Sequence, residues 1–302
     1  MLPFKLIYSS KYDLNLGDHV FPSAKYRLIH EKLLEEGVAT PEDFLEPSPA
    51  PDADIRLVHS ELWVHKLLTG TCTFYDIQRM EIPYSREMVE AVWLAAGGST
   101  LAARCALQDG AALNIGGGFH HAYPDYGEGF CVIHDVAVAI RTLQRDGAIE
   151  RALVVDCDVH QGNGTAAIFG ADETVFTVSL HQENNYPSPK PPSNIDVHLA
   201  DGVGDEEYLA CLQAALEKSF EGEDTRYDLL CYVAGADPYC QDHLGGLMLT
   251  MNGLQRRDAM VFETVRRRKL PVMVTLAGGY AKRVEDTVQI HVNTVRALRE
   301  AL

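Results

Sequence analysis

The sequence predicts an α/β fold in which a central parallel β-sheet is flanked by helices on both faces. Several short runs are apolar without alternation, which is typical of strands buried on both faces of a parallel sheet. Helical patterns separate these runs, and such alternation indicates a layered α/β domain. The five predicted strands are residues 112–115, 152–155, 175–178, 229–233 and 272–276.

Helix signals fill the intervals between these strands. Ser23 can cap a helix that runs to Glu36, and Gly37 follows where a left-handed C-terminal cap belongs. Ser85 can cap a second, alanine-rich helix that ends near Leu107. The later predicted helices run from Asp205 to Phe220, from Asn252 to Arg268 and from Glu285 to Ala301.

The remaining segments are predicted as a first strand and two loops. Residues 1–8 hold a short apolar run with a lysine inside it, which fits an edge or first strand, because a signal peptide has a longer apolar region. Residues 40–54 are rich in proline and acid, and residues 183–193 contain four prolines. Because the polar motifs are spread along the chain and must converge, we expect residues 1–302 to form one domain.

Composition limits the classes of function. The 302 residues carry a formal net charge of −17, which disfavours nucleic acid as a partner, because phosphates require a basic face. That charge suits a cationic substrate, and it equally suits an ordinary acidic surface. Seven cysteines without a C-x-x-C pair argue against a disulfide framework. With neither a signal peptide nor an apolar stretch of about 18 residues, we expect no membrane span and a cytoplasmic location.

The strongest motif follows the strand at 152–155. Asp156, Asp158 and His160 are spaced by two, so in extended chain they share one side. Two neighbouring carboxylates repel unless a positive group lies between them, and a divalent cation bound by Asp158 and His160 would supply it. Gly162 and Gly164 allow a tight turn beside such a site. The alternative is that the carboxylates only cap the next helix.

Three further strand ends carry polar side chains. His120 and His121 follow a glycine run that completes no phosphate-binding motif, and adjacent imidazoles suit proton transfer, although many such pairs are structural. Asp237 ends an apolar strand and would complete a three-ligand site with Asp158 and His160, the arrangement of catalytic zinc. Tyr280 follows two glycines, where a phenol can donate to an oxyanion, although most tyrosines only pack.

Taken in order, these motifs resemble the histone deacetylase family, within the arginase/deacetylase fold, and most closely its class IV branch. The resemblance runs from about Tyr8 to the C-terminus. The matching segments are GGGFHH at 116–121, GFC at 129–131, DCDVHQGNG at 156–164, AGAD at 234–237, LGGL at 244–247 and GGY at 278–280.

The resemblance implies two cation sites. A catalytic Zn²⁺, or Fe²⁺ in its place, would be held by Asp158, His160 and Asp237. A structural K⁺ or Na⁺ would be held by Asp156, Ser179 and the backbone of Asp158, His160 and Leu180.

The resemblance also implies roles for the remaining side chains. His121 would be the general base, His120 its partner oriented by Asp156, and Tyr280 the donor to the substrate carbonyl. Asn163 stands where many relatives have an aspartate that pairs with the second histidine, which is His121 here. Because an amide cannot offset the positive charge of an imidazolium as a carboxylate does, we expect the pKa of His121 to be lower than in relatives with the aspartate. The implied walls of a narrow acyl-lysine tunnel are Gly129, Phe130, Tyr186 and Leu244.

The expected reaction is hydrolysis of an acetyl or longer acyl group from a lysine of a protein or peptide. A small acylated amine, as in an acetylpolyamine amidohydrolase, is the alternative, since no rim aspartate that grips a peptide backbone is identifiable. An arginase-like two-metal enzyme needs a second D-x-D pair, which Gly235-Ala236-Asp237 lacks. A catalytically silent scaffold is disfavoured because every implied ligand is present. No role could be given to His134.

Overall fold

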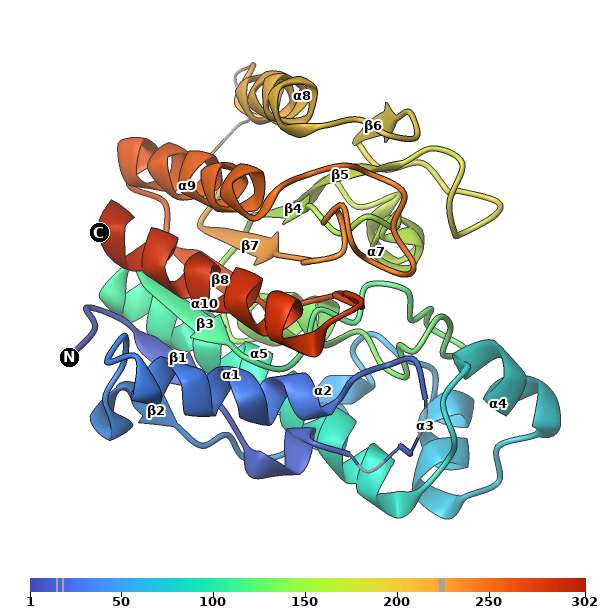
Figure 1. Ribbon diagram of the computed structural model, residues 1–302. Coiled ribbons are helices and arrows are strands. Elements are labelled where there is room, and N and C mark those ends of the chain that lie inside the picture. Colours follow the sequence, from blue (N-terminus) through green and yellow to red (C-terminus); the bar gives the residue numbers. More distant parts are fainter. Residues whose placement is uncertain (15, 18, 223–225) are drawn as a thin grey trace.

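The computed structural model describes residues 1–14, 16–17, 19–222 and 226–302. All eight strands pair in parallel, in the order β2-β1-β3-β8-β7-β4-β5-β6 (Figure 1). The strands are β1 (Lys5–Ile7), β2 (Phe44–Leu45), β3 (Ala111–Asn114), β4 (Ala152–Asp156), β5 (Val175–Gln182), β6 (Ile195–Leu199), β7 (Leu229–Val233) and β8 (Val272–Thr275). This sheet, with helices on both faces, confirms the predicted fold class.

The helices cover the sheet and connect most of the successive strands, whereas β5 passes to β6 through a loop. The α-helices are α1 (Ala24–Glu35), α2 (Asp52–Ile55), α3 (Glu61–Thr69), α4 (Phe74–Met80), α5 (Arg86–Asp109), α6 (Asp135–Arg145), α7 (Asn163–Phe169), α8 (Asp205–Lys218), α9 (Met251–Arg268) and α10 (Val284–Ala301), with 3₁₀ turns η1 (Ser10–Tyr12) and η2 (Pro41–Asp43). Among the residues that the structure describes, no helix is both long and apolar enough to span a bilayer.

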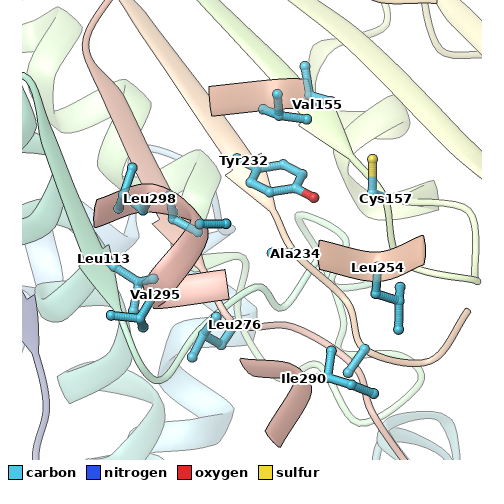
Figure 2. Packing of buried hydrophobic residues seen from close by; sticks show 14 of the residues in the cluster. Leu113, Val155, Cys157, Tyr232, Ala234, Leu254, Leu276, Ile290, Val295 and Leu298 are labelled. Carbon is cyan, nitrogen blue, oxygen red and sulfur yellow. The ribbon is translucent and has the colours of Figure 1, made fainter. Parts of the chain in front are cut away.

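Side chains alternate between the two faces along each strand, because the side-chain period of a strand is two. Leu153 and Val155 of β4 enter one hydrophobic cluster, whereas Ala152 and Val154 enter another. The first cluster packs β3, β4, β7 and β8 against α1, α8, α9 and α10, and the second packs the opposite face against α5, α6 and α7. Figure 2 shows part of the first cluster, in which Leu254 of α9 and side chains of α10 lie among those of the strands.

The central strands end in register. Asn114 of β3 lies opposite Thr275 of β8, which lies opposite Val233 of β7. Val233 in turn lies opposite Asp156 of β4, and Asp156 opposite Ser179 of β5. The loops that leave these strands therefore begin at one edge of the sheet, which is where parallel α/β sheets bind ligands.

A third hydrophobic cluster supports the loop between β3 and α6. Trp63 of α3 is fully buried there beside residues of α5, and its indole donates to the carbonyl of Val132 at 3.0 Å. The long helix α5 starts with the Ser85 hydroxyl accepting from the amide of Met88 and ends at Gly110, whose φ is +89°. Ser85 is the predicted N-terminal cap, and the helix ends two residues after the predicted end near Leu107.

Several elements differ from the sequence-based expectations. The segment 40–54 is not only a loop, because it contains η2, the edge strand β2 and the start of α2. Strand β6 and helices α3, α4, α6 and α7 were not predicted. Helices α3, α4 and α7 are short, and β6 alternates apolar and polar residues in place of a continuous apolar run. Ser23 precedes α1, but its hydroxyl donates to the carbonyl of Leu14 instead of capping the helix.

Candidate active site

The side chains proposed for the reaction gather at the carboxyl edge of the sheet, in the loops that follow the strands, at the last residue of β4 (Asp156) and at the first residue of α7 (Asn163). His120 and His121 follow β3, Asp158 and His160 follow β4, and the loops after β7 and β8 carry Asp237 and Tyr280. These strands are neighbours in the order β3-β8-β7-β4, so segments far apart in sequence converge.

Asp158, His160 and Asp237 form a buried cluster. One ligand atom from each lies within 4.8 Å of the others, and the described part of the chain has no other such group of three. The Nδ1 atom of His160 is 3.0 Å from Oδ1 of Asp158 and 3.4 Å from Oδ2 of Asp237. Exposure of the three residues is 1%, 7% and 0% respectively.

The cluster fits a divalent cation. Oδ2 of Asp237 is buried and has no hydrogen-bond partner among the described residues, as expected of an oxygen that ligates a cation. Burial first, and then the charge of Asp158, raises the pKa of Asp237. A Cβ on Gly278 would lie 2.0 Å from Oδ2 of Asp237 and 2.4 Å from Oδ2 of Asp158, so only glycine leaves these oxygens room. Two carboxylates and one imidazole are a donor set that zinc accepts.

Backbone amides fix the two carboxylates. Asp158 accepts from the amide of Gly278 at 2.9 Å, and Asp237 accepts from the amide of Val159 at 2.9 Å. Each of the two carboxylates is thus held by the loop after a strand other than its own: Asp158 by the loop after β8, and Asp237 by the loop after β4. The buried guanidinium of Arg257 donates to the carbonyls of Cys157 at 3.2 Å and Gly235 at 2.6 Å, which ties together the ends of β4 and β7.

The two histidines differ in their partners. Nδ1 of His120 lies 2.6 Å from Oδ2 of Asp156, whereas Nδ1 of His121 lies 2.6 Å from Oδ1 of Asn163. Burial alone would lower the pKa of His120, but Asp156 and then Asp158 outweigh it and raise the pKa to about 9. The pKa of His121 lies well below its ordinary value because of burial and the positive charges of His120 and His160.

A narrow cavity of about 200 Å³ leads to this cluster. Gly129 packs tightly against two side chains of the cavity wall: a Cβ on Gly129 would lie 3.0 Å from the ring of His121 and 3.0 Å from the ring of Tyr186. Gly129 and Phe130 both have positive φ, +52° and +67°, which turns the Phe130 ring toward Tyr280 with centroids 5.9 Å apart. The lining residues are Glu81, His121, Gly129, Phe130, His160, Asn185, Tyr186, Leu244 and Tyr280. All four predicted tunnel residues are among them; Glu81 and Asn185 were not singled out.

One carboxylate missed in the sequence organises the cavity wall. Asp242 accepts from the backbone amides of Tyr280 at 2.6 Å, Leu244 at 2.8 Å and Gly245 at 3.1 Å. A single side chain therefore holds the loop after β7 against the loop after β8. The only sequence signal for Asp242 is its place two residues before the L-G-G-L segment.

Replacing Asp242 by alanine is expected to loosen both loops. The buried amide of Tyr280 and the partly buried amides of Leu244 and Gly245 would lose their acceptor. Each unsatisfied buried group costs about 1–3 kcal/mol unless water replaces the acceptor. Asp242→Ala should lower the midpoint of urea unfolding and lower turnover, whereas Asp242→Asn keeps an acceptor oxygen and should do less of both. Equal stability of all three proteins would contradict this role.

Lys25, on α1, is another residue missed in the sequence. Its ammonium is fully buried and donates to the carbonyl of Ala277 at 2.6 Å, 5.8 Å from the Tyr280 ring centre. Burial lowers the pKa of Lys25 to about 8, although Asp237 and Asp158 oppose this shift. This group places positive charge behind the acidic cluster.

The predicted monovalent-cation residues lie beside the main cluster. Asp156, at the end of β4, lies opposite Ser179 in the middle of β5, and Leu180 is buried next to Ser179. The Ser179 hydroxyl lies 2.9 Å from Nδ1 of His181. The K⁺ or Na⁺ site stays a prediction.

His134 has a structural position. Its Nδ1 accepts from the amide of Ala137 at 3.2 Å and so caps α6, and its Nε2 lies 2.8 Å from the Thr165 hydroxyl. The next residue, Asp135, accepts from the amides of Gly118 and Phe119 at 3.0 and 2.8 Å. This pair therefore shapes the loop that carries His120 and His121.

A parallel α/β sheet whose carboxyl edge gathers these groups at the base of a narrow cavity defines a hydrolase of the arginase/deacetylase fold. The comparisons with known proteins identify the family within that class. The chain belongs to the histone deacetylase family, because the histone deacetylase domain matches residues 19–295.

Relatives from several organisms agree with this assignment. Histone deacetylase 2 of Arabidopsis thaliana is 30% identical, over 92% of this chain and 74% of that protein. A probable deacetylase of Methanothermobacter thermautotrophicus is 32% identical, over 91% and 85%. An uncharacterized protein of Picosynechococcus is 42% identical, over 98% and 99%. The family relationship is thus confirmed, whereas the class IV branch stays a prediction.

Solved structures agree in fold. The crystal structure of an HDAC homologue complexed with SAHA superposes with a TM-score of 0.84 at 24% identity, over 98% of this chain and 84% of that one. An HDAC homologue from Aquifex aeolicus gives a TM-score of 0.82 at 24% identity, over 98% and 84%. At this identity the likeness establishes the fold alone.

Proposed function

We propose that the protein is a zinc-dependent deacylase that removes acetyl or longer acyl groups from lysine side chains. The observation that carries the proposal is the convergence of Asp158, His160 and Asp237 with a histidine pair and Tyr280 at the base of one narrow cavity. Membership of a deacetylase family supports hydrolysis of an acylated amine.

Asp158, His160 and Asp237 would hold the zinc, which supplies a Lewis acid at the amide carbonyl when bound. Zinc is assigned because catalytic zinc takes three protein ligands and keeps one position open, an arrangement of oxygen and nitrogen donors that Fe²⁺ also accepts. The two carboxylates would offset the charge of the ion, and their backbone hydrogen bonds hold them in place without further side-chain movement.

The histidine pair would divide the proton transfers. His121 lines the cavity and has a neutral amide as its partner, so it stays neutral and accepts the proton of the attacking water. His120 has the carboxylate of Asp156 as its partner, which stabilises an imidazolium. The pair would then return a proton to the leaving amine.

Tyr280 would donate a hydrogen bond from its phenolic hydroxyl to the carbonyl oxygen as negative charge develops there. Burial, together with the charges of Asp158 and Asp237, raises its pKa well above the ordinary value. The phenol therefore keeps its proton at neutral pH and remains a donor.

The cavity walls favour an extended aliphatic arm. Phe130, Tyr186 and Leu244 present mostly apolar surface around a narrow passage, which suits the methylene chain of a lysine. One observation favours the second candidate, a small acylated amine: the exposed carboxylate of Glu81 stands among the lining residues and would attract a free ammonium group.

A substrate panel separates the two candidates. Acetyl-, decanoyl- and myristoyl-lysine peptides are assayed beside acetylputrescine with the zinc-loaded protein. Hydrolysis of at least one lysine peptide at a higher kcat/KM than acetylputrescine is the expected result. Negligible rates on every lysine peptide, with turnover of acetylputrescine, would replace the proposal by the second candidate.

A further inference from the structure

The partner of His121 is an amide, and an amide has two chemically different ends. The Asn163 side chain can present its Oδ1, which accepts a hydrogen bond, or its Nδ2, which donates one. The end that faces Nδ1 of His121 decides which ring nitrogen carries the proton. A carboxylate at this position would leave no such choice, because both of its oxygens accept.

Glu128 selects the end. Its Oε1 lies 2.7 Å from Nδ2 of Asn163, and an ionised carboxylate can only accept. Nδ2 must therefore point to Glu128, which leaves Oδ1 to face Nδ1 of His121 at 2.6 Å. Nδ1 is then the donor, so Nε2 of His121 is unprotonated and can accept a proton.

The Glu128 side chain is fixed by its surroundings. Its backbone exchanges hydrogen bonds with Cys131, at 2.8 and 2.9 Å, across the turn made by Gly129 and Phe130. The Tyr186 hydroxyl donates to the same Oε1 atom at 2.9 Å. Glu128 is half-buried, so its carboxylate is not free to turn into solvent without losing both partners.

We propose that Glu128 is a positioning residue that acts through the Asn163 amide to hold His121 in the tautomer a general base requires. Without an acceptor at this place, the amide can rotate by half a turn and donate to Nδ1, which moves the proton to Nε2. The kinetic consequence rests on the proposed deacylase function, whereas the tautomer does not.

The first test reads the tautomer directly. In the full-length, zinc-loaded protein labelled with ¹⁵N-histidine, the His121 signals are assigned by their loss in His121→Gln. The expected spectrum shows a proton on Nδ1 in the wild type and a population with the proton on Nε2 in Glu128→Met, which keeps side-chain length but removes the acceptor. An unchanged Nδ1 proton in Glu128→Met would overturn the proposal. Glu128→Leu gives the same test if the methionine variant does not fold.

The second test is kinetic. Glu128→Met should lower kcat by about 10- to 1,000-fold, below the roughly 10⁴ cost of a wrong tautomer in a serine protease triad. Glu128→Gln retains an acceptor oxygen and should keep most of the activity. Asn163→Asp combined with Glu128→Met should recover most of kcat, because the introduced aspartate has no donor end; failure of that recovery would contradict the proposal.

Two controls separate other effects of Glu128. Tyr186→Phe removes only the second hydrogen bond to Glu128 and should raise KM more than it lowers kcat. Asp125→Asn removes an exposed carboxylate from the same loop and should leave activity unchanged. If the wild type hydrolyses no substrate of the panel, the proposed function fails, and the NMR result still decides the tautomer.

Discussion

Asp237→Ala is expected to abolish zinc binding and with it all hydrolysis. The substitution leaves two protein ligands where catalytic zinc uses three. Wild-type protein should be stabilised by about 2.7 kcal/mol when free zinc reaches 100 times its dissociation constant. The variant should show the same thermal midpoint with and without zinc, and metal analysis after dialysis should find none bound.

The metal-free proteins provide a second comparison. Because the Asp237 carboxylate is fully buried beside that of Asp158, its removal relieves repulsion in the absence of a cation. The same substitution leaves the buried amide of Val159 without its acceptor, so metal-free Asp237→Ala should unfold close to the temperature of metal-free wild type. Asp109→Ala, an exposed carboxylate at the amino end of β3, should keep the zinc response. A zinc-dependent rise in Asp237→Ala equal to that of the wild type would exclude Asp237 as a ligand.

Tyr280→Phe is expected to lower kcat by about 10²–10³, the cost of removing one oxyanion donor. The ring would keep its contacts with Phe130, whose centroid lies 5.9 Å away, so the cavity keeps its shape. KM and zinc content should change little, because the phenol is proposed to act only as charge develops on the carbonyl oxygen. Steady-state kinetics on the best substrate of the panel, with metal analysis of the same sample, measures all three quantities.

The matched control is Tyr239→Phe. Tyr239 is also a buried tyrosine, but it lies in the loop after β7. The kcat of this variant should stay close to the wild-type value. Full activity of Tyr280→Phe would show that another group stabilises the oxyanion, and loss of zinc in that variant would mean that the tyrosine supports the metal site instead.

Local patterns in the sequence were sufficient for much of the fold. The strands at β3, β4, β5, β7 and β8 were predicted because each is a continuous apolar run between turn signals. Strand β6 was missed, because its sequence Ile195-Asp196-Val197-His198-Leu199 alternates and lies at the edge of the sheet. Helix α6 was missed because the segment was considered only for the His134-Asp135 pair that begins it.

The same contrast holds at the site. Asp156, Asp158 and His160 could be predicted together since they are two residues apart at the end of one strand. Glu128 acts on a residue 35 positions away, Asp242 on one 38 positions away, and Lys25 on one 252 positions away. No spacing rule connects such pairs.

The sequence by itself determined the parallel α/β class, the strand ends that carry chemistry and the family to which the chain belongs, because these depend on short-range periodicity and on consecutive motifs. Only the tertiary structure decided how the polar atoms are arranged: the buried Oδ2 of Asp237, which has no hydrogen-bond partner in the part of the chain that the structure describes, the single carboxylate that holds Tyr280 and Leu244, and the orientation of the Asn163 amide. The physical reason is that hydrogen bonding and metal coordination require two atoms to be placed to within a few tenths of an ångström, although the atoms belong to segments that lie far apart in the sequence.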